Sequence, residues 1–285
     1  NPAAHLENLK PLPPADPILD ACTECGFCEC HCPSRNLSLT PRQRIVIQRE
    51  IARLGRTGEN ASRLAALKRG YAWQGEATCA ADGLCALACP VDVDTGKFTK
   101  TLRSRSVNGK AVQWLADQAA DHFAALTAGI RTGLQTADRM HRLVGTSAMR
   151  RLAAAAHRLS RDRLPAWLPA MPAAADPPRI RSQRGGPETA VVYFPACVSR
   201  TMGPGADDPL TDPLHRVTQR VLERAGYRVI YPEGIDDLCC GLPFESKGFF
   251  AQAHRKAVQL EKALLAASAG GRLPVLCDTS PCLER

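Results

Sequence analysis

Aromatic residues are scarce in this chain, since Phe, Trp and Tyr together make up 5% of its 285 residues. That scarcity argues against a nucleic-acid surface, which needs stacking rings among its basic residues, although the formal net charge is +9. Apolar runs are shorter than the roughly 20 residues of a membrane-spanning helix, so we expect any membrane contact to be peripheral. A Gly-rich dinucleotide fingerprint is also absent, and neither flavin nor nicotinamide is expected to bind to this stretch alone.

An initiator Met and a secretory signal peptide are missing too, because the chain begins at Asn1 and runs into a Pro-rich lead-in. We interpret residues 1–20 as a linker from a preceding domain. The chain stops at Arg285, directly after a cysteine-bearing segment, so we expect the sequence to be a fragment. The predicted location is the cytoplasm, with the inner face of the cell membrane as the surface for any peripheral contact.

Cysteine, in contrast, is abundant, with 13 residues in the chain. These cysteines form two tight groups and one spaced set, not the scattered intervals of a secreted disulfide framework. That distribution favours metal or cluster binding in a reducing compartment.

Composition and periodicity predict the order of the domains. Residues 21–108 hold the two tight cysteine groups, and apolar residues at steps of three and four predict a helical hairpin over 109–164. This hairpin packs on the protein's own core or on a missing domain, or it binds a partner or a membrane surface. Prolines mark a linker over 165–188, and residues 189–285 alternate strand and helix, as in a small α/β domain with a parallel sheet. The predicted fold class is therefore mainly α with a C-terminal α/β part.

The interval between the two tight cysteine groups is predicted to form two helices. Thr40 supplies an N-cap and Pro41 the first helical position of one helix, which Gly55 and Gly58 are expected to end. The second helix is expected to run to about Gly70. Two helices in place of a short β-hairpin predict a helical two-cluster ferredoxin domain.

The first cysteine motif reads Cys22-x-x-Cys25-x-x-Cys28-x-x-x-Cys32-Pro33. This spacing is typical of bacterial ferredoxin clusters. Three thiolates at two-residue gaps can wrap three corners of one cubane, while the fourth cysteine ligates the other cluster. The alternative is a zinc site built from the same four thiols.

The second motif repeats this plan with one substitution, as Cys79-x-x-Asp82-x-x-Cys85-x-x-x-Cys89-Pro90. Asp82 stands where a second cysteine is expected. A carboxylate is a harder and more exchangeable ligand than a thiolate, so Asp82 either binds iron or is an ordinary turn residue.

If the fourth cysteine of each motif ligates the cluster of the other motif, the residues divide between two iron–sulfur clusters. The first cluster takes Cys22, Cys25, Cys28 and Cys89. The second cluster takes Cys79, Cys85 and Cys32, with Asp82 as its candidate fourth ligand. It is therefore either a [4Fe–4S] cluster with an Asp or water corner or a [3Fe–4S] centre.

Two residues are surplus to the first motif, Cys30 and His31. In one interpretation, these two residues contact the cluster ligands and thereby tune the properties of a cluster. The other interpretation makes Cys30 a buried thiol without a ligand role.

A third set of cysteines follows the strands expected in the C-terminal part. Its members are Cys197, Cys239, Cys240 and Cys277, with Cys282 beyond them. They stand at or just after strand ends, where α/β sheets place their sites. They form a third cluster site, a redox-active pair at Cys239 and Cys240, or a group of inert thiols.

These motifs together resemble the iron–sulfur half of bacterial FAD-linked D-lactate dehydrogenases. The resemblance is carried by residues 18–46, 82–85, 91–97, 194–203, 239–244 and 277–282. The iron–sulfur subunits of glycolate oxidase and of anaerobic glycerol-3-phosphate dehydrogenase are similar in plan, more distantly.

The resemblance implies an FAD domain in the same chain, ahead of the Pro-rich linker, that takes a hydride from a 2-hydroxy acid. It also implies that the clusters pass the electrons to a quinone or cytochrome. Residues 189–285 resemble one repeat of the heterodisulfide-reductase Cys-Cys-Gly domain, although Ser280 stands where that domain has its last cysteine. A disulfide-reductase module at Cys239 and Cys240 and a structural zinc module remain the alternatives.

Overall fold

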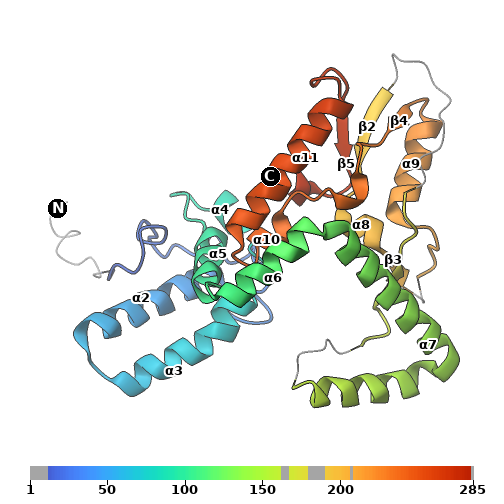
Figure 1. Ribbon diagram of the computed structural model, residues 1–285. Helices are drawn as coiled ribbons and strands as arrows, with labels where there is room; N and C mark the ends of the chain where they lie inside the picture. The colour runs from blue at the N-terminus through green and yellow to red at the C-terminus, as the bar shows by residue number, and fades with distance from the viewer. Residues whose placement is uncertain (1–11, 162–166, 179–189, 206–207, 284–285) are drawn as a thin grey trace. The chain divides into compact units, whose positions relative to one another are not determined.

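The structure is a computed structural model, shown in Figure 1. It describes residues 12–161, 167–178, 190–205 and 208–283. The chain divides into two compact units. Unit 1 ends at Gln113 and also includes Pro243–Phe250, while unit 2 consists of Trp114–Leu242 and the chain from Ala251 onward. Helices dominate, and the described strands lie in unit 2, so the predicted mainly-α fold with a C-terminal α/β part is confirmed.

The first helix of unit 1, α2 (Pro41–Thr57), begins as the sequence predicts. Thr40 and Gln43 form a capping box, in which each side chain binds the other residue's backbone N–H. The helix ends at Gly58, whose φ of 69° is a left-handed conformation that glycine adopts without strain. Gly55 lies inside the helix, so the expectation that it would help to end it is wrong.

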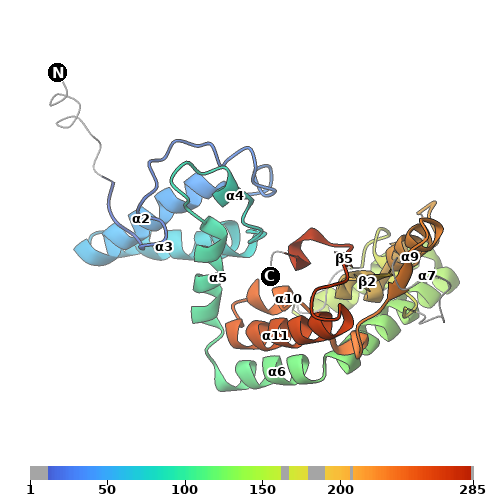
Figure 2. The ribbon, with the colours of Figure 1, turned by 90° about the horizontal axis from the view of Figure 1, so that it is seen from above.

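The predicted second helix follows directly. The next helical segments of unit 1 along the chain are α3 (Ala61–Tyr71), the π-helical turn η1 (Ala72–Ala77), α4 (Leu84–Leu87) and α5 (Thr95–Ser106). Figures 1 and 2 show α2 and α3 side by side as a helical hairpin. Helices therefore fill the interval between the two cysteine motifs.

The apolar core of unit 1 lies directly beneath the cysteine loops. Its buried side chains are Leu19, Ile45, Val93 and Phe98. Cys22 of the first motif and Cys89 of the second both pack against this core. Apolar packing thus holds the two motifs together.

Unit 1 also contains a segment from the distant C-terminal part of the sequence, Pro243–Phe250. Its Glu245 forms an ion pair of 2.9 Å with Lys100 of α5. A Cβ atom at Gly248 would stand 2.3 Å from the backbone nitrogen of Ser104, so only glycine permits this approach. The sequence analysis placed this segment in the α/β domain.

Two helices follow, α6 (Lys110–Asp121), in which unit 2 begins, and α7 (Phe123–Leu159). The predicted helical pattern is present, but it is interrupted at His122, whose backbone is not helical. A second break lies within α7 at Gly145, where φ is 77° and ψ is 166°. The Arg-rich end of α7 is therefore a separate helical segment.

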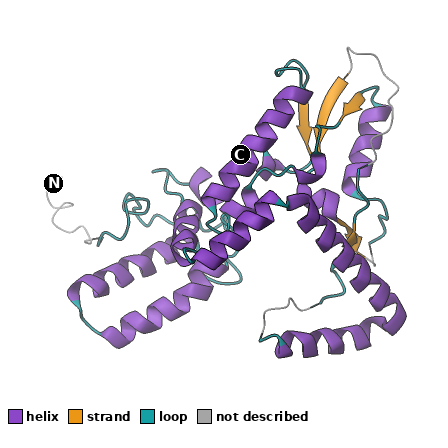
Figure 3. Ribbon diagram, viewed as in Figure 1, coloured by secondary structure: helices purple, strands orange, loops and turns teal. Residues whose placement is uncertain are grey.

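A parallel three-stranded sheet forms the centre of unit 2, in the order β4-β2-β5 (Figure 3). Its elements are β2 (Ala190–Phe194), α9 (Leu214–Arg224), β4 (Arg228–Ile230), α11 (Phe250–Ala267) and β5 (Val275–Cys277). All five residues of β2 are buried, because Phe194 packs towards α11 and Val191 towards α9. The predicted strand–helix alternation is confirmed.

Shorter elements complete unit 2. They are β1 (Pro172–Ala174), α8 (Cys197–Thr201), β3 (Met202–Gly205), η3 (Ile235–Asp237), α10 (Leu242–Glu245, largely in unit 1) and η4 (Ser280–Cys282). Strands β1 and β3 pair in an antiparallel sheet, so part of the region predicted as linker is a strand. Across the described residues, no helix combines the length and hydropathy needed to cross a bilayer.

Candidate metal centres

Four cysteines from the two motifs line one cavity in unit 1. They are Cys22, Cys25, Cys28 and Cys89. The remaining wall is mostly apolar and includes Ile45, Val91 and Val93. The volume of the cavity, including its open mouth, is about 360 Å³. Four thiols around one apolar cavity form a donor set that fits a thiolate-held iron–sulfur cluster. These are the four residues that the sequence assigns to the first cluster.

The thiol of Cys28 lies at the N-terminus of α2, where the backbone N–H of Arg42 donates to it. Burial raises the pKa of Cys28 to about 11, and the Arg42 N–H opposes that effect. Free N–H groups and the helix dipole favour negative charge at this position. An anionic cluster held by Cys28 would gain that stabilisation.

The second motif repeats this arrangement at the N-terminus of α5. The side chain of Asp94 caps the helix, and the backbone N–H groups of Gly96 and Thr95 donate to the thiol of Cys85. Burial raises the pKa of Cys85, and these two N–H groups oppose the rise. The cysteine at the third ligand position of each motif, Cys28 or Cys85, therefore lies at a helix N-terminus, an equivalence that spacing alone does not reveal.

The segment that follows Cys32 is joined to the segment that precedes Cys79. The hydroxyl of Ser34 donates to the carbonyl of Thr78, and Ser38 and Thr78 share a hydroxyl hydrogen bond of 2.6 Å. Cys32, from the first motif, is therefore held beside the start of the second motif. The crossover of Cys32 to the second cluster stays a prediction.

Buried arginines hold the two cysteine loops in place. Arg49 of α2 donates to the carbonyl of Cys22 at 2.8 Å, and Arg103 of α5 donates to the carbonyl of Cys79 at 2.8 Å. Both side chains are less than a tenth exposed. Their positive charges also lie close to where anionic clusters would form.

Asp82 is exposed, and its Oδ1 accepts a hydrogen bond of 3.2 Å from the backbone N–H of Leu84. This contact is the turn role that the sequence offers as one interpretation. The ligand role stays a prediction.

Replacing Asp82 with cysteine should complete an all-thiolate second site, lower its reduction potential and make the cluster more resistant to loss. Redox titration followed by EPR measures the change. Asp82→Asn is the matched control, because the amide keeps an oxygen for the Leu84 N–H while the charge is lost. An unchanged spectrum and potential in Asp82→Cys would show that position 82 does not touch iron.

The surplus residues of the first motif, Cys30 and His31, are both exposed. The thiol of Cys30 donates to the carbonyl of Phe27 at 3.4 Å. The interpretation of Cys30 as a buried thiol is wrong, because the loop turns its side chain towards solvent.

Replacing Thr40 with alanine should lower the free energy of unfolding by about 1 kcal/mol, the usual cost of losing an N-cap. The Thr40 hydroxyl also donates to Glu29 at 2.6 Å, which ties the first cysteine loop to α2. Anaerobic urea denaturation measures the loss. Thr101→Ala is the control, because that hydroxyl donates at an exposed position to a helical carbonyl. Equal effects of the two substitutions would contradict the assigned role.

Unit 2 brings five thiols together in a continuous chain of hydrogen bonds. Cys239 bonds to Cys197 and to Cys240, and Cys240 lies 3.3 Å from Cys282, sulfur to sulfur. Cys282 also bonds to Cys277. These bonds lower the pKa of Cys197 and of Cys277, while the pKa of Cys239 and of Cys282 is raised.

Cys282 is not among the ligands predicted from the sequence, but the structure places it beside Cys240. The short helix η4 follows β5 and turns Cys282 back towards the adjacent cysteine pair. Ser280, at the expected cysteine position, is exposed. The one available signal was that Cys282 lies two residues after this departure from the expected pattern.

Glycine is required after the Cys239-Cys240 pair. Gly241 has a φ of 90°, and a Cβ atom there would stand 2.3 Å from the carbonyl oxygen of Ala253 in α11. The close approach of α11 thus explains the Cys-Cys-Gly sequence.

Arg200 joins the Cys197 loop to the loop before Cys239. Its buried guanidinium donates to the carbonyls of Pro195, Ile235 and Leu238. The charge of Arg200 also favours a Cys197 thiolate.

Asp278 joins the Cys197 loop to the Cys277 loop. Its carboxylate accepts hydrogen bonds from the hydroxyl of Tyr193 at 2.9 Å and from the backbone N–H of Ala196 at 2.8 Å. The loops that carry the thiols are therefore fixed to one another by charged side chains.

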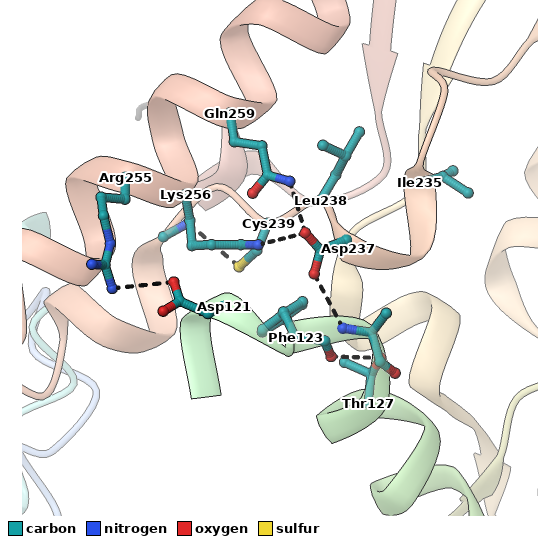
Figure 4. A network of polar contacts seen from close by, with 12 residues as sticks. Asp121, Phe123, Thr127, Ile235, Asp237, Leu238, Cys239, Arg255, Lys256 and Gln259 are labelled. Carbon is teal, nitrogen blue, oxygen red and sulfur yellow. Dashed lines mark hydrogen bonds and ion pairs between the residues drawn. The ribbon is translucent and has the colours of Figure 1, made fainter. Parts of the chain in front are cut away.

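A further polar network anchors the loop that leads to Cys239 (Figure 4). The carboxylate of Asp237 accepts from Lys256 at 3.3 Å, from Gln259 at 2.7 Å and from the backbone N–H of Ala124 at 3.3 Å. Burial alone would raise the pKa of Asp237, but the hydrogen bonds from Gln259 and Lys256 outweigh it and lower that pKa. Lys256 is almost fully buried against α7, so the loss of Asp237 would leave its charge buried without a partner anion.

Residues 21–94 match the family described as the 4Fe-4S dicluster domain. No curated protein and no solved structure matches the chain. Among the described residues, no group of three or more His, Cys, Asp or Glu side chains is arranged so that it could hold a single metal ion. The family match contains both tight cysteine motifs, so this part of the chain is an iron–sulfur module with an electron-transfer role.

Proposed function

We propose that the chain is the electron-transfer segment of a flavin-dependent dehydrogenase of the D-lactate type, which oxidises 2-hydroxy acids. In this proposal an FAD domain of the same protein takes the hydride, and the clusters carry electrons singly to a quinone or cytochrome. A flavin accepts two electrons at once whereas each cluster passes one, so a series of clusters can drain it stepwise.

The observation that carries the proposal is the convergence of Cys22, Cys25, Cys28 and Cys89 on one apolar cavity. Two motifs that exchange their fourth ligand hold two clusters close together, as electron transfer requires. The 2-hydroxy acid substrate and the FAD rest on the sequence resemblance.

The five-thiol group of unit 2 is proposed to hold a third cluster at the exit end of this series. Support comes from the hydrogen-bonded chain that joins Cys197, Cys239, Cys240, Cys282 and Cys277. Arg200 supplies positive charge next to it, which favours thiolates over thiols.

The proposed location is the cytoplasm, with a peripheral contact on the inner face of the membrane when the acceptor is a quinone. The Arg-rich end of α7 suits such a contact, because it exposes Leu152 and Leu159 beside its arginines. Binding to vesicles with and without anionic lipid would test this part of the proposal separately.

A second candidate function is a disulfide reductase at the Cys239-Cys240 pair. The contact of 3.3 Å between the sulfurs of Cys240 and Cys282 favours it, because these two thiols can form a disulfide by releasing two electrons and two protons. This function predicts thiol-dependent turnover without a flavin partner. A structural zinc module predicts a colourless protein with stoichiometric zinc.

Anaerobic purification followed by iron, sulfide and zinc analysis tests the proposed function. We expect a brown protein with iron and acid-labile sulfide for at least two four-iron clusters, which photoreduced flavin reduces and a quinone analogue or cytochrome c reoxidises. The isolated chain should not oxidise D-lactate or glycolate. Zinc in place of iron, or clusters that reduced flavin cannot reduce, would overturn the proposal.

A further inference from the structure

Arg44 of α2 is a buried cation beside one predicted cluster ligand. Its side chain is 1% exposed, and its Nη1 lies 3.6 Å from the sulfur of Cys32. Its Nε donates to the carbonyl of Gly75 at 2.8 Å, which fixes the plane of the guanidinium. Arg44 therefore links the crossed-over thiol of the first motif to the π-helical turn that leads to Cys79.

The guanidinium has more donors than the protein satisfies. Its Nη2 is buried and has no hydrogen-bond partner among the described residues. A buried charged donor without an acceptor is costly, so such groups are usually found where a ligand or cofactor supplies one. The sulfurs of an iron–sulfur cluster accept hydrogen bonds, and a cluster held by Cys32 would be an acceptor of the kind that Nη2 lacks.

We propose that Arg44 raises the reduction potential of the cluster that Cys32 ligates. This inference rests on the proposed function, because it takes Cys32 as a ligand of the second cluster. Reduction adds one negative charge to the cluster, and a buried cation that donates to the ligating sulfur stabilises the reduced form more than the oxidised form. Arg44 acts through Cys32, and the tight packing around it keeps water from screening the charge.

The corresponding ligand of the first cluster has different surroundings. Cys89 packs against the apolar core formed by Leu19, Ile45, Val93 and Phe98. Removal of the Arg44 charge is therefore expected to affect the two clusters unequally. This inequality provides an internal reference within one molecule.

The test is an EPR-monitored redox titration of Arg44→Gln, Arg44→Lys and the unsubstituted chain. In Arg44→Gln, the midpoint potential of the second cluster should fall by at least about 59 mV, which corresponds to a tenfold change in its one-electron equilibrium constant. The midpoint of the first cluster should move much less. Arg44→Lys keeps the charge and should recover part of the shift.

Arg49→Gln is the matched control, because Arg49 is equally buried on the same helix but donates to the carbonyls of Cys22 and Asp20 and to Glu24. It should leave the midpoint of the second cluster in place. Equal shifts of both clusters in Arg44→Gln, or none with both clusters present, would overturn the inference. Absence of iron from the unsubstituted chain would instead overturn the proposed function.

A second measurement does not depend on the folding of a variant. Pulsed EPR of the reduced second cluster should detect a ¹⁴N coupling in the unlabelled chain. The same coupling should become a ¹⁵N coupling when the arginines are labelled with ¹⁵N. A coupling that is unchanged by the label, or no nitrogen coupling, would place Arg44 away from the cluster and would refute the inference.

Discussion

Replacing Cys89 with alanine is expected to remove the first cluster, although Cys89 belongs to the second motif. Replacing Cys32 should damage the second cluster, although Cys32 belongs to the first motif. The physical reason is that Cys89 lines the same cavity as Cys22, Cys25 and Cys28. Loss of one of four ligands opens that cluster to solvent and to dissociation, so we expect most of the corresponding iron to be lost.

Iron and sulfide analysis together with EPR distinguishes the two clusters in each variant. Cys30→Ala is the matched control, because Cys30 lies in the same loop and its side chain is exposed. The control should keep the iron content of the unsubstituted chain. Crossover would be refuted if Cys89→Ala kept the first cluster intact and lost the second.

Local features of the fold could be predicted from the sequence. The start of α2 depends on Thr40 and Pro41, which act within one turn, and the buried strand β2 depends on an unbroken apolar run. The four cysteines that spacing assigns to the first cluster line one cavity, and their role as ligands stays a prediction. These signals lie within a few residues of the structure that they determine.

Features that depend on distant contacts could not be predicted. The inclusion of Pro243–Phe250 in unit 1 depends on Lys100 and on the backbone of Ser104, more than a hundred residues away. The place of Cys282 depends on a short helix after β5 and on a contact with Cys240. Neither contact leaves a periodic pattern or a fixed spacing in the sequence.

Replacing Cys282 with alanine is expected to remove the proposed third cluster while both clusters of unit 1 remain. Cys282 is the sulfur that connects Cys240 to Cys277 in the five-thiol group. Without it, the hydrogen-bonded chain of thiols is divided into two parts. The iron content should fall by the amount that one cluster contains, and the EPR signals of the two clusters in unit 1 should be unchanged.

Electron delivery should slow in the same variant. The rate at which a quinone analogue or cytochrome c reoxidises the reduced chain should fall at least ~10-fold. A loss of this size is the lower end of what is found when a residue that hydrogen-bonds to a metal ligand is removed. In the proposed flavin-dependent enzyme, reduction of the flavin by the 2-hydroxy acid should continue at its normal rate. Ser280→Ala is the control, because Ser280 is an exposed residue of the same short helix.

The disulfide-reductase alternative predicts a different result for the same variant. If Cys240 and Cys282 form a disulfide, the oxidised chain loses two hydrogen atoms, which mass spectrometry under non-reducing conditions detects, and its iron content does not depend on Cys282. Flavin reduction that collapses in Cys282→Ala, with cluster reoxidation untouched, would place the five-thiol group on the entry side of the electron path. A third cluster at the exit requires the opposite pattern, because removing an exit step leaves the preceding clusters reduced and slows only the transfer to the acceptor.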